Sequence, residues 1–249
     1  MDDIELARHL AHGAARILMA LRSAATAEGA IHDQKALGAE GDLRANDWLM
    51  AQLAVHRADD GVLSEETQDT PARLAKSRVW IIDPLDGTRE YGEGRSDWAV
   101  HVGLAVDGTA TLGAVALPVL GVVLDSGAPL PLLPMVARPR LLVSRTRPAR
   151  EAVEAARVLG GELIAMGSAG AKAMAVVRGE AEIYVHSGGQ YEWDNCAPVA
   201  VAAAAGLHVS RIDGAPLVYN NRDTYVPDLL ICRAEWAKRV LDAVAAIET

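Results

Sequence analysis

The sequence predicts an α/β protein built from an α+β half and an α/β half. Three patterns predict it: helical spacing of apolar residues near the N-terminus, a run of short apolar strands in the middle, and strands alternating with helices after that. The stretch 127–139 is rich in proline, which favours a connection between halves. We therefore expect one half at 1–135 and the other at 136–249.

The first half should begin with two helices. Apolar residues recur at helical spacing from 4 to 24, and a similar pattern runs from about Asp42 to His56. Between them, residues 29–41 carry three glycines and mixed charges, and we expect a mobile loop there.

A sheet should follow these helices. The continuous apolar run at 78–82 is typical of a buried strand, and 98–106, 111–117 and 120–124 have strand character. Short links between them predict an antiparallel meander.

The second half should alternate strands with helices, which indicates an α/β layer. We expect strands near 140–144, 162–166, 181–185, 207–211 and 228–232, and helices at 148–158, from the Gly167–Gly170 turn to Arg178, at 194–205 and at 234–247. A glycine-rich bend should interrupt the chain at 187–189.

The composition restricts the function. The net charge of −9 argues against a broad nucleic-acid surface, because phosphate backbones require clustered lysine and arginine. The acidity indicates carboxylates that hold cations, although a solvated acidic surface accounts for most of the 33 acidic residues in any case. The two cysteines form no metal or disulfide spacing, and the N-terminus has no signal-peptide character, so we expect a cytoplasmic protein without a membrane segment.

The central motif is Asp83-Pro84-Leu85-Asp86-Gly87-Thr88, directly after an apolar strand. Pro84 disrupts a regular ladder, and Gly87 permits a tight bend. Two carboxylates three residues apart on such a turn can meet at one point, where a hard cation such as Mg²⁺ finds oxygen ligands. A lone pair of aspartates in a loop is more often an ordinary turn; the whole hexapeptide is more specific.

Two further motifs are weaker by themselves. Ser64-Glu65-Glu66-Thr67 is compatible with a solvated loop, and Asp194 of Trp193-Asp194 could be an ordinary helix N-cap. In combination the motifs are more specific than each one alone. Glu65 lies 18 residues before Asp83, and Trp193 lies 110 residues after Asp83.

This pattern resembles the inositol monophosphatase superfamily along nearly the whole chain. The segments WIIDPLDGTREY, GSAGAKAMAV and YEWD are most similar to its CysQ-type bisphosphate nucleotidases. The resemblance implies a layered αβαβα sandwich of the sugar-phosphatase type, a homodimer, lithium sensitivity, a place in sulfate assimilation, and two or three Mg²⁺ ions per site.

The resemblance also implies residue roles. One Mg²⁺ would be held by Glu65, Asp83 and the Leu85 carbonyl, and a second by Asp83, Asp86 and Asp194. Thr88 would orient the attacking water with help from Glu65, and Asp47 would hydrogen-bond to Thr88. Backbone N–H groups of Gly87 and Thr88 would bind phosphate oxygens at a helix N-terminus.

The implied substrate is 3′-phosphoadenosine 5′-phosphate, converted to AMP and phosphate. Ser168 and Lys172 would lie near its nucleotide portion, with Asp194 close by; an ordinary solvated lysine is the alternative for Lys172. The metal motifs do not separate this activity from inositol-1-phosphatase or fructose-1,6-bisphosphatase. From another class, an inactive regulator that binds a phosphorylated metabolite also stays open.

Overall fold

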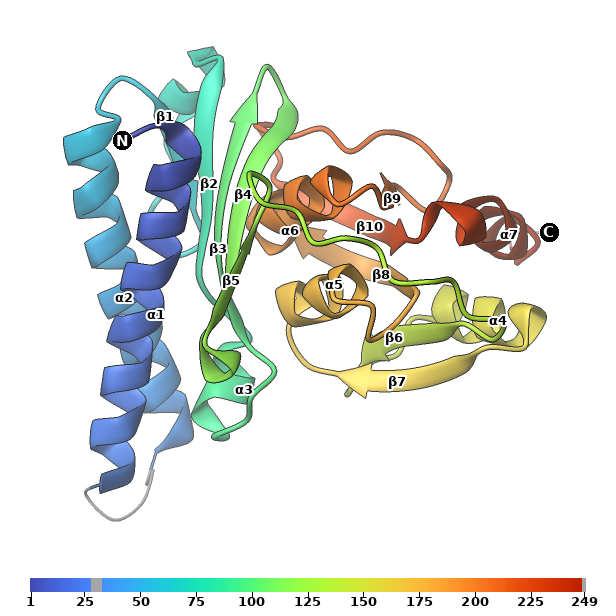
Figure 1. The fold of residues 1–249 in the computed structure, drawn as a ribbon. Coiled ribbons are helices and arrows are strands. Elements are labelled where there is room, and N and C mark those ends of the chain that lie inside the picture. The colour runs from blue at the N-terminus through green and yellow to red at the C-terminus, as the bar shows by residue number, and fades with distance from the viewer. Residues whose placement is uncertain (28–32, 248–249) are drawn as a thin grey trace.

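The computed structural model describes residues 1–27 and 33–247, and it has five layers of helix and sheet. Two long helices cover the outer face of a first sheet, two helices lie between this sheet and a second one, and two more cover the second sheet's far face (Figure 1). The predicted αβαβα sandwich is therefore confirmed. None of the helices in the described part of the chain is long and apolar enough to cross a membrane.

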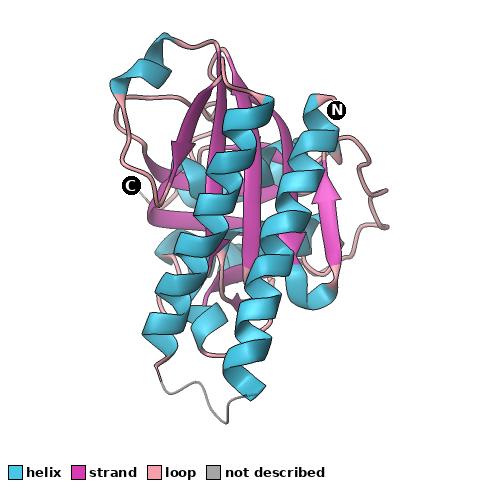
Figure 2. Cartoon of the chain, turned by 90° about the vertical axis from the view of Figure 1, so that its left-hand side faces the viewer, coloured by secondary structure: helices cyan, strands magenta, loops and turns pink. Residues whose placement is uncertain are grey.

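The outer layer consists of α1 (Asp3–Ala27) and α2 (Gln34–His56), which lie side by side over one face of the first sheet (Figure 2). Their apolar faces pack on the first sheet around Leu10, Leu49 and Trp80, all fully buried. The expectation that helices cover this region is confirmed at 4–24 and 42–56.

The predicted loop at 29–41 is wrong where the structure describes it, because 34–41 form the first turns of α2. The Asp33 carboxylate accepts a hydrogen bond from the Ala36 N–H at 2.9 Å and caps the helix. The glycines permit close packing: a Cβ on Gly38 would lie 2.7 Å from Thr88 Cγ2. Residues 29–32 of the predicted loop lie outside the described residues.

The first sheet has strand order β1-β2-β3-β4-β5. Its strands are β1 (Gly61–Ser64), β2 (Arg78–Asp86), β3 (Ala99–Val106), β4 (Thr109–Leu117) and β5 (Val122–Asp125), with short 3₁₀ turns at Pro71–Ala75 and Pro118–Leu120. The antiparallel meander from β2 to β5 is confirmed. β1, a four-residue strand that pairs in parallel with β2, was not predicted.

The second sheet has strand order β7-β6-β8-β10-β9. Its strands are β6 (Arg140–Ser144), β7 (Glu162–Met166), β8 (Ile183–Tyr191), β9 (His208–Ser210) and β10 (Tyr225–Cys232). Parallel pairing of β6 with β7 and β8 agrees with the predicted α/β half. The predicted bend at 187–189 is instead part of β8, where Gly188 and Gly189 adopt positive φ beside a register shift against β10.

The inner helices are α5 (Ala169–Val177) and α6 (Glu192–Ala204), and the far layer is α4 (Arg150–Leu159) with α7 (Ala234–Ala245). The expected boundary near residue 135 stays a prediction. It falls in the segment 126–139, which connects the two sheets without a helix or strand.

Candidate active site

Parallel pairing of β1 with β2 brings two predicted metal ligands to one sheet edge. Ser64 lies opposite Ile82, and the N–H of Glu65 donates to the Ile82 carbonyl at 3.2 Å. Glu65 therefore leaves β1 at the level where Asp83 occurs in β2. Because parallel strands end on the same side, residues 18 positions apart become neighbours.

A bulge in β2 turns Asp83 and Asp86 to the same side. Asp83 lies opposite His101 and Asp86 opposite Ala99, so three steps on β2 match two on β3. In a regular strand, residues three apart point to opposite faces, and the extra residue removes this opposition. Pro84 falls within the irregularity, where its missing N–H breaks no ladder bond.

Asp194 from the second half completes this group. It lies in the first turn of α6, where its Oδ2 accepts a hydrogen bond from the Tyr191 N–H at 2.5 Å. One carboxylate oxygen from each of Asp83, Asp86 and Asp194 lies within 4.8 Å of the other two. We call these three residues the second acidic cluster, because another cluster, described below, comes from residues earlier in the chain. The structure thus brings together the three carboxylates assigned from the sequence to one cation.

Asp86 is the most firmly held member of that cluster. It accepts hydrogen bonds from the Ser168 hydroxyl, from the Ala169 N–H at 3.1 Å and from the Gly170 N–H at 2.6 Å, all at the start of α5. His101 Nε2 lies 3.1 Å from Asp86 Oδ2. Burial alone raises the pKa of Asp86, but the His101 charge and these hydrogen bonds outweigh it and lower the pKa to about 2.

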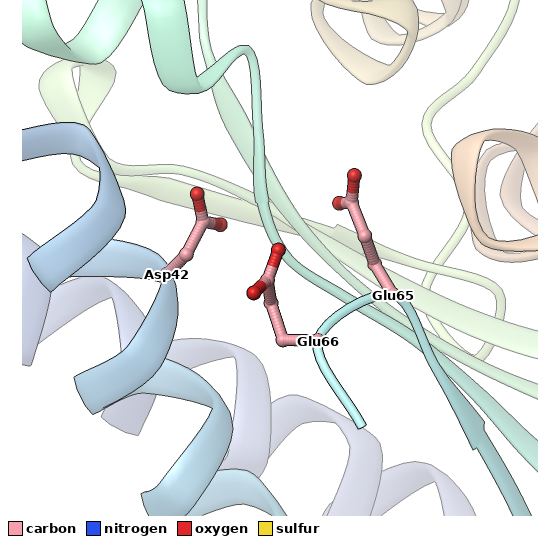
Figure 3. Close-up of side chains that lie close together, drawn as sticks. All are labelled: Asp42, Glu65 and Glu66. Carbon is pink, nitrogen blue, oxygen red and sulfur yellow. The ribbon is translucent and has the colours of Figure 1, made fainter. Parts of the chain in front are cut away.

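A first acidic cluster lies beside it and consists of Asp42, Glu65 and Glu66 (Figure 3). Asp42 comes from α2, and the two glutamates follow β1. Asn46 ties these elements together: its Oδ1 accepts from the Ser64 hydroxyl at 2.7 Å, and its amide donates to Thr67 Oγ1 at 3.0 Å. Figure 3 shows the three carboxyl groups extending from α2 and from the end of β1 into the same space.

Thr88 is oriented by Asp42, and the assignment of Asp47 to this contact is wrong. The Thr88 hydroxyl donates to Asp42 Oδ2 at 2.9 Å, and Asp47 is exposed. Asp42 is on the buried face of α2 with Leu49 and Leu53, whereas Asp47 is on its outer face. The helix was predicted to start at Asp42, and this late start concealed that face.

The pKa values of most of these carboxyl groups are raised. Burial, then neighbouring negative charges, raises the pKa of Asp42 to about 8, that of Glu65 to about 7, and that of Asp194 to about 6. The pKa of Asp83 is raised well above its usual range for the same reasons. Glu65 keeps contact with solvent, yet Asp194, Glu66 and Asp86 surround it with like charge. Such a group of carboxylates favours a bound cation.

The turn after Asp86 has the geometry that the motif predicts. Gly87 adopts φ of 91° and caps α3 (Thr88–Gly92), a short helix that the sequence analysis did not name. A Cβ on Gly87 would lie 3.1 Å from Ser168 Cβ and 3.2 Å from Trp98 Cβ, so glycine is required for both space and conformation. The Leu85 carbonyl lies 3.2 Å from the Thr88 hydroxyl, on the side of Asp42.

Ser168 and Lys172 belong to the second half of the chain and lie near this turn, at the N-terminal end of α5. Ser168 adopts φ of 53°, a strained conformation for a non-glycine residue, and caps α5. Lys172 is buried, and its ammonium donates to the carbonyls of Ser168 and, at 3.3 Å, Gly167. It is therefore not a solvated surface lysine. A cavity of about 350 Å³ opens beside Thr88, lined also by Gln34, Lys35, Arg89 and Glu93.

The sequence analysis missed two residues of this site. Asp42 could have been found by extending the helical spacing of Leu49 and Leu53 toward the N-terminus. His101 was not among the predicted site residues, yet it lies on β3 opposite Asp83 and contacts Asp86. Burial lowers the His101 pKa, but the Asp86 charge outweighs this and raises it. No sequence spacing indicates this contact, because it depends on the β2–β3 register.

Comparison with known proteins agrees with this geometry. Residues 2–248 match the inositol monophosphatase family. The chain belongs to this family. One member of similar sequence is the 3′-phosphoadenosine 5′-phosphate phosphatase of Mycobacterium leprae, 43% identical over 263 residues that cover 99% of this chain and 95% of the relative. The protein of the same name from Mycobacterium tuberculosis is 48% identical over 84% of this chain and 82% of its own length.

More distant members of the family extend the likeness. The 3′(2′),5′-bisphosphate nucleotidase CysQ of Escherichia coli is 33% identical over 74% of this chain and 80% of its own length. The crystal structure of CysQ from Bacteroides thetaiotaomicron has a TM-score of 0.76 at 22% identity and covers 93% of this chain and 97% of that one. Inositol monophosphatase II from Staphylococcus aureus has a TM-score of 0.78 at 19% identity and covers 96% and 95%. These structures establish the shared fold.

Proposed function

We propose that this protein is a magnesium-dependent phosphomonoesterase that converts 3′-phosphoadenosine 5′-phosphate and water to AMP and phosphate. The observation that carries the proposal is the convergence of Asp83, Asp86 and Asp194 within 4.8 Å, next to a threonine held by Asp42. The mycobacterial relatives, which are similar to this protein over most of its chain, are named for this reaction.

The residues of the site fit Mg²⁺. They offer carboxylate and carbonyl oxygens, the ligands that this hard cation prefers. Asp42 Oδ1 is buried and has no hydrogen-bond partner among the described residues, and the raised carboxyl pKa values indicate negative charge that lacks a counterion. We assign Glu65, Asp83 and the Leu85 carbonyl to one Mg²⁺, and Asp83, Asp86 and Asp194 to a second, with a third ion near Glu65. When bound, Mg²⁺ lowers the pKa of water and stabilises the charge of a leaving oxygen.

The residues around Thr88 position the attacking water. Because the Thr88 hydroxyl donates its proton to Asp42, its lone pairs can accept a hydrogen bond from that water. Glu65 follows β1 beside Asp42, the acceptor of the Thr88 hydroxyl, so its carboxylate is within reach of a water held by Thr88. We propose that Glu65 takes the water's proton while Thr88 fixes the direction of its oxygen.

The substrate phosphate would lie against the turn at Gly87. The first N–H groups of a helix have no partner within that helix, so those of Gly87 and Thr88 are available to phosphate oxygens. We propose Ser168 and Lys172 as contacts on the other side. Lys172 uses two of its three ammonium donors on carbonyls of its own turn, and it adds positive charge close to the phosphate.

The decisive test is phosphate release by the purified protein with Mg²⁺. It compares 3′-phosphoadenosine 5′-phosphate, inositol-1-phosphate and fructose-1,6-bisphosphate at equal concentration. We expect a preference for the nucleotide of about a hundredfold in kcat/KM, which corresponds to about 2.7 kcal/mol. Equal rates on the sugar phosphates would make the enzyme a broad-specificity phosphatase, and no release from any substrate would favour a phosphometabolite-binding regulator.

Three further points belong to the proposal. We propose a homodimer in the cytoplasm, inhibition by lithium, and a role in sulfate assimilation. Both cysteines, Cys196 and Cys232, are buried and free, which fits a reducing compartment. Light scattering and inhibition by LiCl test the first two of these points directly.

A further inference from the structure

One arginine outside the proposed metal site joins the two halves. Arg145 follows β6 in the second half and reaches α3 in the first. Its Nη2 lies 2.8 Å from Glu90 Oε1 and 2.9 Å from Glu93 Oε2. All three side chains are largely shielded, with 23%, 13% and 26% of their surfaces exposed. One guanidinium therefore ties the second half to the helix that starts at Thr88.

Contacts on either side of Arg145 show how closely the halves fit there. The Gly167 N–H donates to Asp97 Oδ2 at 2.6 Å, and a Cβ on Gly167 would lie 2.6 Å from Glu90 Cδ. On the other side of α3, Gly87 packs against Ser168. The turn that would bind phosphate is thus enclosed by the second half, and Arg145 supplies the positive charge of this contact.

We propose that Arg145 is a positioning residue of the phosphomonoesterase reaction. It holds α3 against the second half, so that the N–H groups of Gly87 and Thr88 face the same phosphate as Ser168 and Asp194. It also neutralises Glu90 and, together with Arg89, Glu93; these carboxylates would otherwise repel an anion one helical turn from Thr88. Arg145 acts through α3 and does not touch the reacting atoms. This inference rests on the proposed function.

The physical reason is that phosphate needs donors from both halves at once. Small displacements of donors from the reacting geometry cost large factors in rate. Loss of Arg145 would let α3 shift, would take this cation from Glu90, and would leave Glu93 with Arg89 alone. The metal ligands are held separately, Asp83 by the β2–β3 pairing and Asp86 by α5, so Mg²⁺ binding should change little.

The test compares Arg145→Gln, Arg145→Lys and the wild-type enzyme. For Arg145→Gln we expect kcat/KM for 3′-phosphoadenosine 5′-phosphate to fall about tenfold and the inhibition constant of inorganic phosphate to rise by a similar factor. The Mg²⁺ concentration for half-maximal activity should stay within about twofold, because the metal ligands are untouched. Arg145→Lys should recover part of the loss, since it restores the charge without the forked geometry.

Two controls separate this effect from general damage. Arg157→Gln removes an arginine of the same half whose side chain is 71% exposed and pairs with Glu154, and it should leave all constants unchanged. Adding Glu90→Gln and Glu93→Gln to Arg145→Gln should recover phosphate affinity, because no unpaired carboxylates remain. Thermal unfolding establishes that each variant is folded.

A second measurement does not require turnover. Calorimetry with inorganic phosphate and Mg²⁺ gives a dissociation constant that should weaken about tenfold in Arg145→Gln. Equal phosphate affinity and equal kcat/KM in folded Arg145→Gln would overturn the inference. If phosphate affinity falls in Arg145→Gln but the wild-type protein releases phosphate from no substrate, the proposed function would be removed, and Arg145 would keep only its role in holding the phosphate-binding turn.

Discussion

The two acidic clusters hold the same kind of side chain in different surroundings. In the second cluster, Asp86 meets His101 and three donors at the start of α5, and its pKa falls to about 2. In the first cluster, Asp42 meets Glu65 and Glu66, and its pKa rises to about 8. The second cluster thus carries part of its own neutralising charge, and the first depends on a cation from solution.

The difference teaches that sequence motifs locate carboxylates, whereas their charge state is set by what the fold places against them. Asp83 and Asp86 belong to one hexapeptide, yet their pKa values shift in opposite directions. His101 contacts Asp86 Oδ2 at 3.1 Å and approaches Asp83 Oδ2 only to 4.0 Å. The closer His101 contact and the three donors at the start of α5 thus separate Asp86, whose pKa falls, from Asp83, whose pKa rises.

The largest expected effect comes from Asp83→Asn, which affects both proposed cation sites. We expect kcat to fall on the order of 10³-fold, because the proposed bridging ligand loses its charge. The measurement is steady-state phosphate release at saturating Mg²⁺. A protein that only binds phosphometabolites would instead lose affinity and show no turnover to begin with.

The next largest expected effect compares two aspartates of α2, Asp42 on the buried face and Asp47 on the outer face. Asp42→Asn should lower kcat about a hundredfold, because Thr88 loses the carboxyl acceptor that orients its hydroxyl. Asp47→Asn, the same change on the outer face of the same helix, should leave kcat within about twofold. Equal losses in the two variants would contradict the orientation of α2 described above.

A smaller effect tests the packing that anchors the second cluster. A Cβ on Gly170 would overlap Nε2 of His101, so Gly170→Ala should destabilise the protein by about 1–3 kcal/mol. Chemical denaturation with an unchanged m-value measures this loss. Unaltered stability would mean that His101 does not occupy the position between Gly170 and Asp86.

The smallest expected effect is the pH dependence of folding stability, which follows from the raised pKa values of the clustered carboxyl groups. The folded-state pKa values of Asp42, Glu65 and Asp194 are raised to about 8, 7 and 6. A carboxyl group whose pKa is raised by folding stabilises the folded state fully at pH values below its unfolded pKa, near 4. This contribution to stability is lost as the pH rises through the folded-state pKa values of 6 to 8. Glu65 keeps solvent contact, so its share is reduced by screening.

Metal-free protein should therefore become less stable between pH 5 and 8.5, and Mg²⁺ should reverse the loss by pairing with the ionised carboxylates. We expect the Tm difference between saturating Mg²⁺ and EDTA to grow across this range. The Asp42→Asn variant should show a flatter profile, because it lacks the group with the highest of the three values. A Tm difference independent of pH would count against the assigned shifts.

Much of this site could be predicted because short-range chemistry determines it. Pro84 and Gly87 constrain the backbone wherever they occur, so the hexapeptide predicts a turn with two carboxylates. The apolar runs of β2 to β5 predict a meander, since short links leave adjacent strands few alternatives. The loop predicted from the glycines at 38 and 41 was wrong, because these glycines lie in α2 and permit its close packing against neighbouring elements.

The sequence by itself determined the strand–turn motif, the alternation of strands and helices in the second half, and three carboxylates, Asp83, Asp86 and Asp194, that the fold brings together. Only the tertiary structure decided that Asp42 and not Asp47 holds Thr88, that His101 neutralises Asp86, and that Arg145 joins the halves. These contacts link residues on different elements, and their geometry depends on helix rotation and strand register. A local pattern of residue types contains neither quantity, because both arise when the helices and sheets pack together.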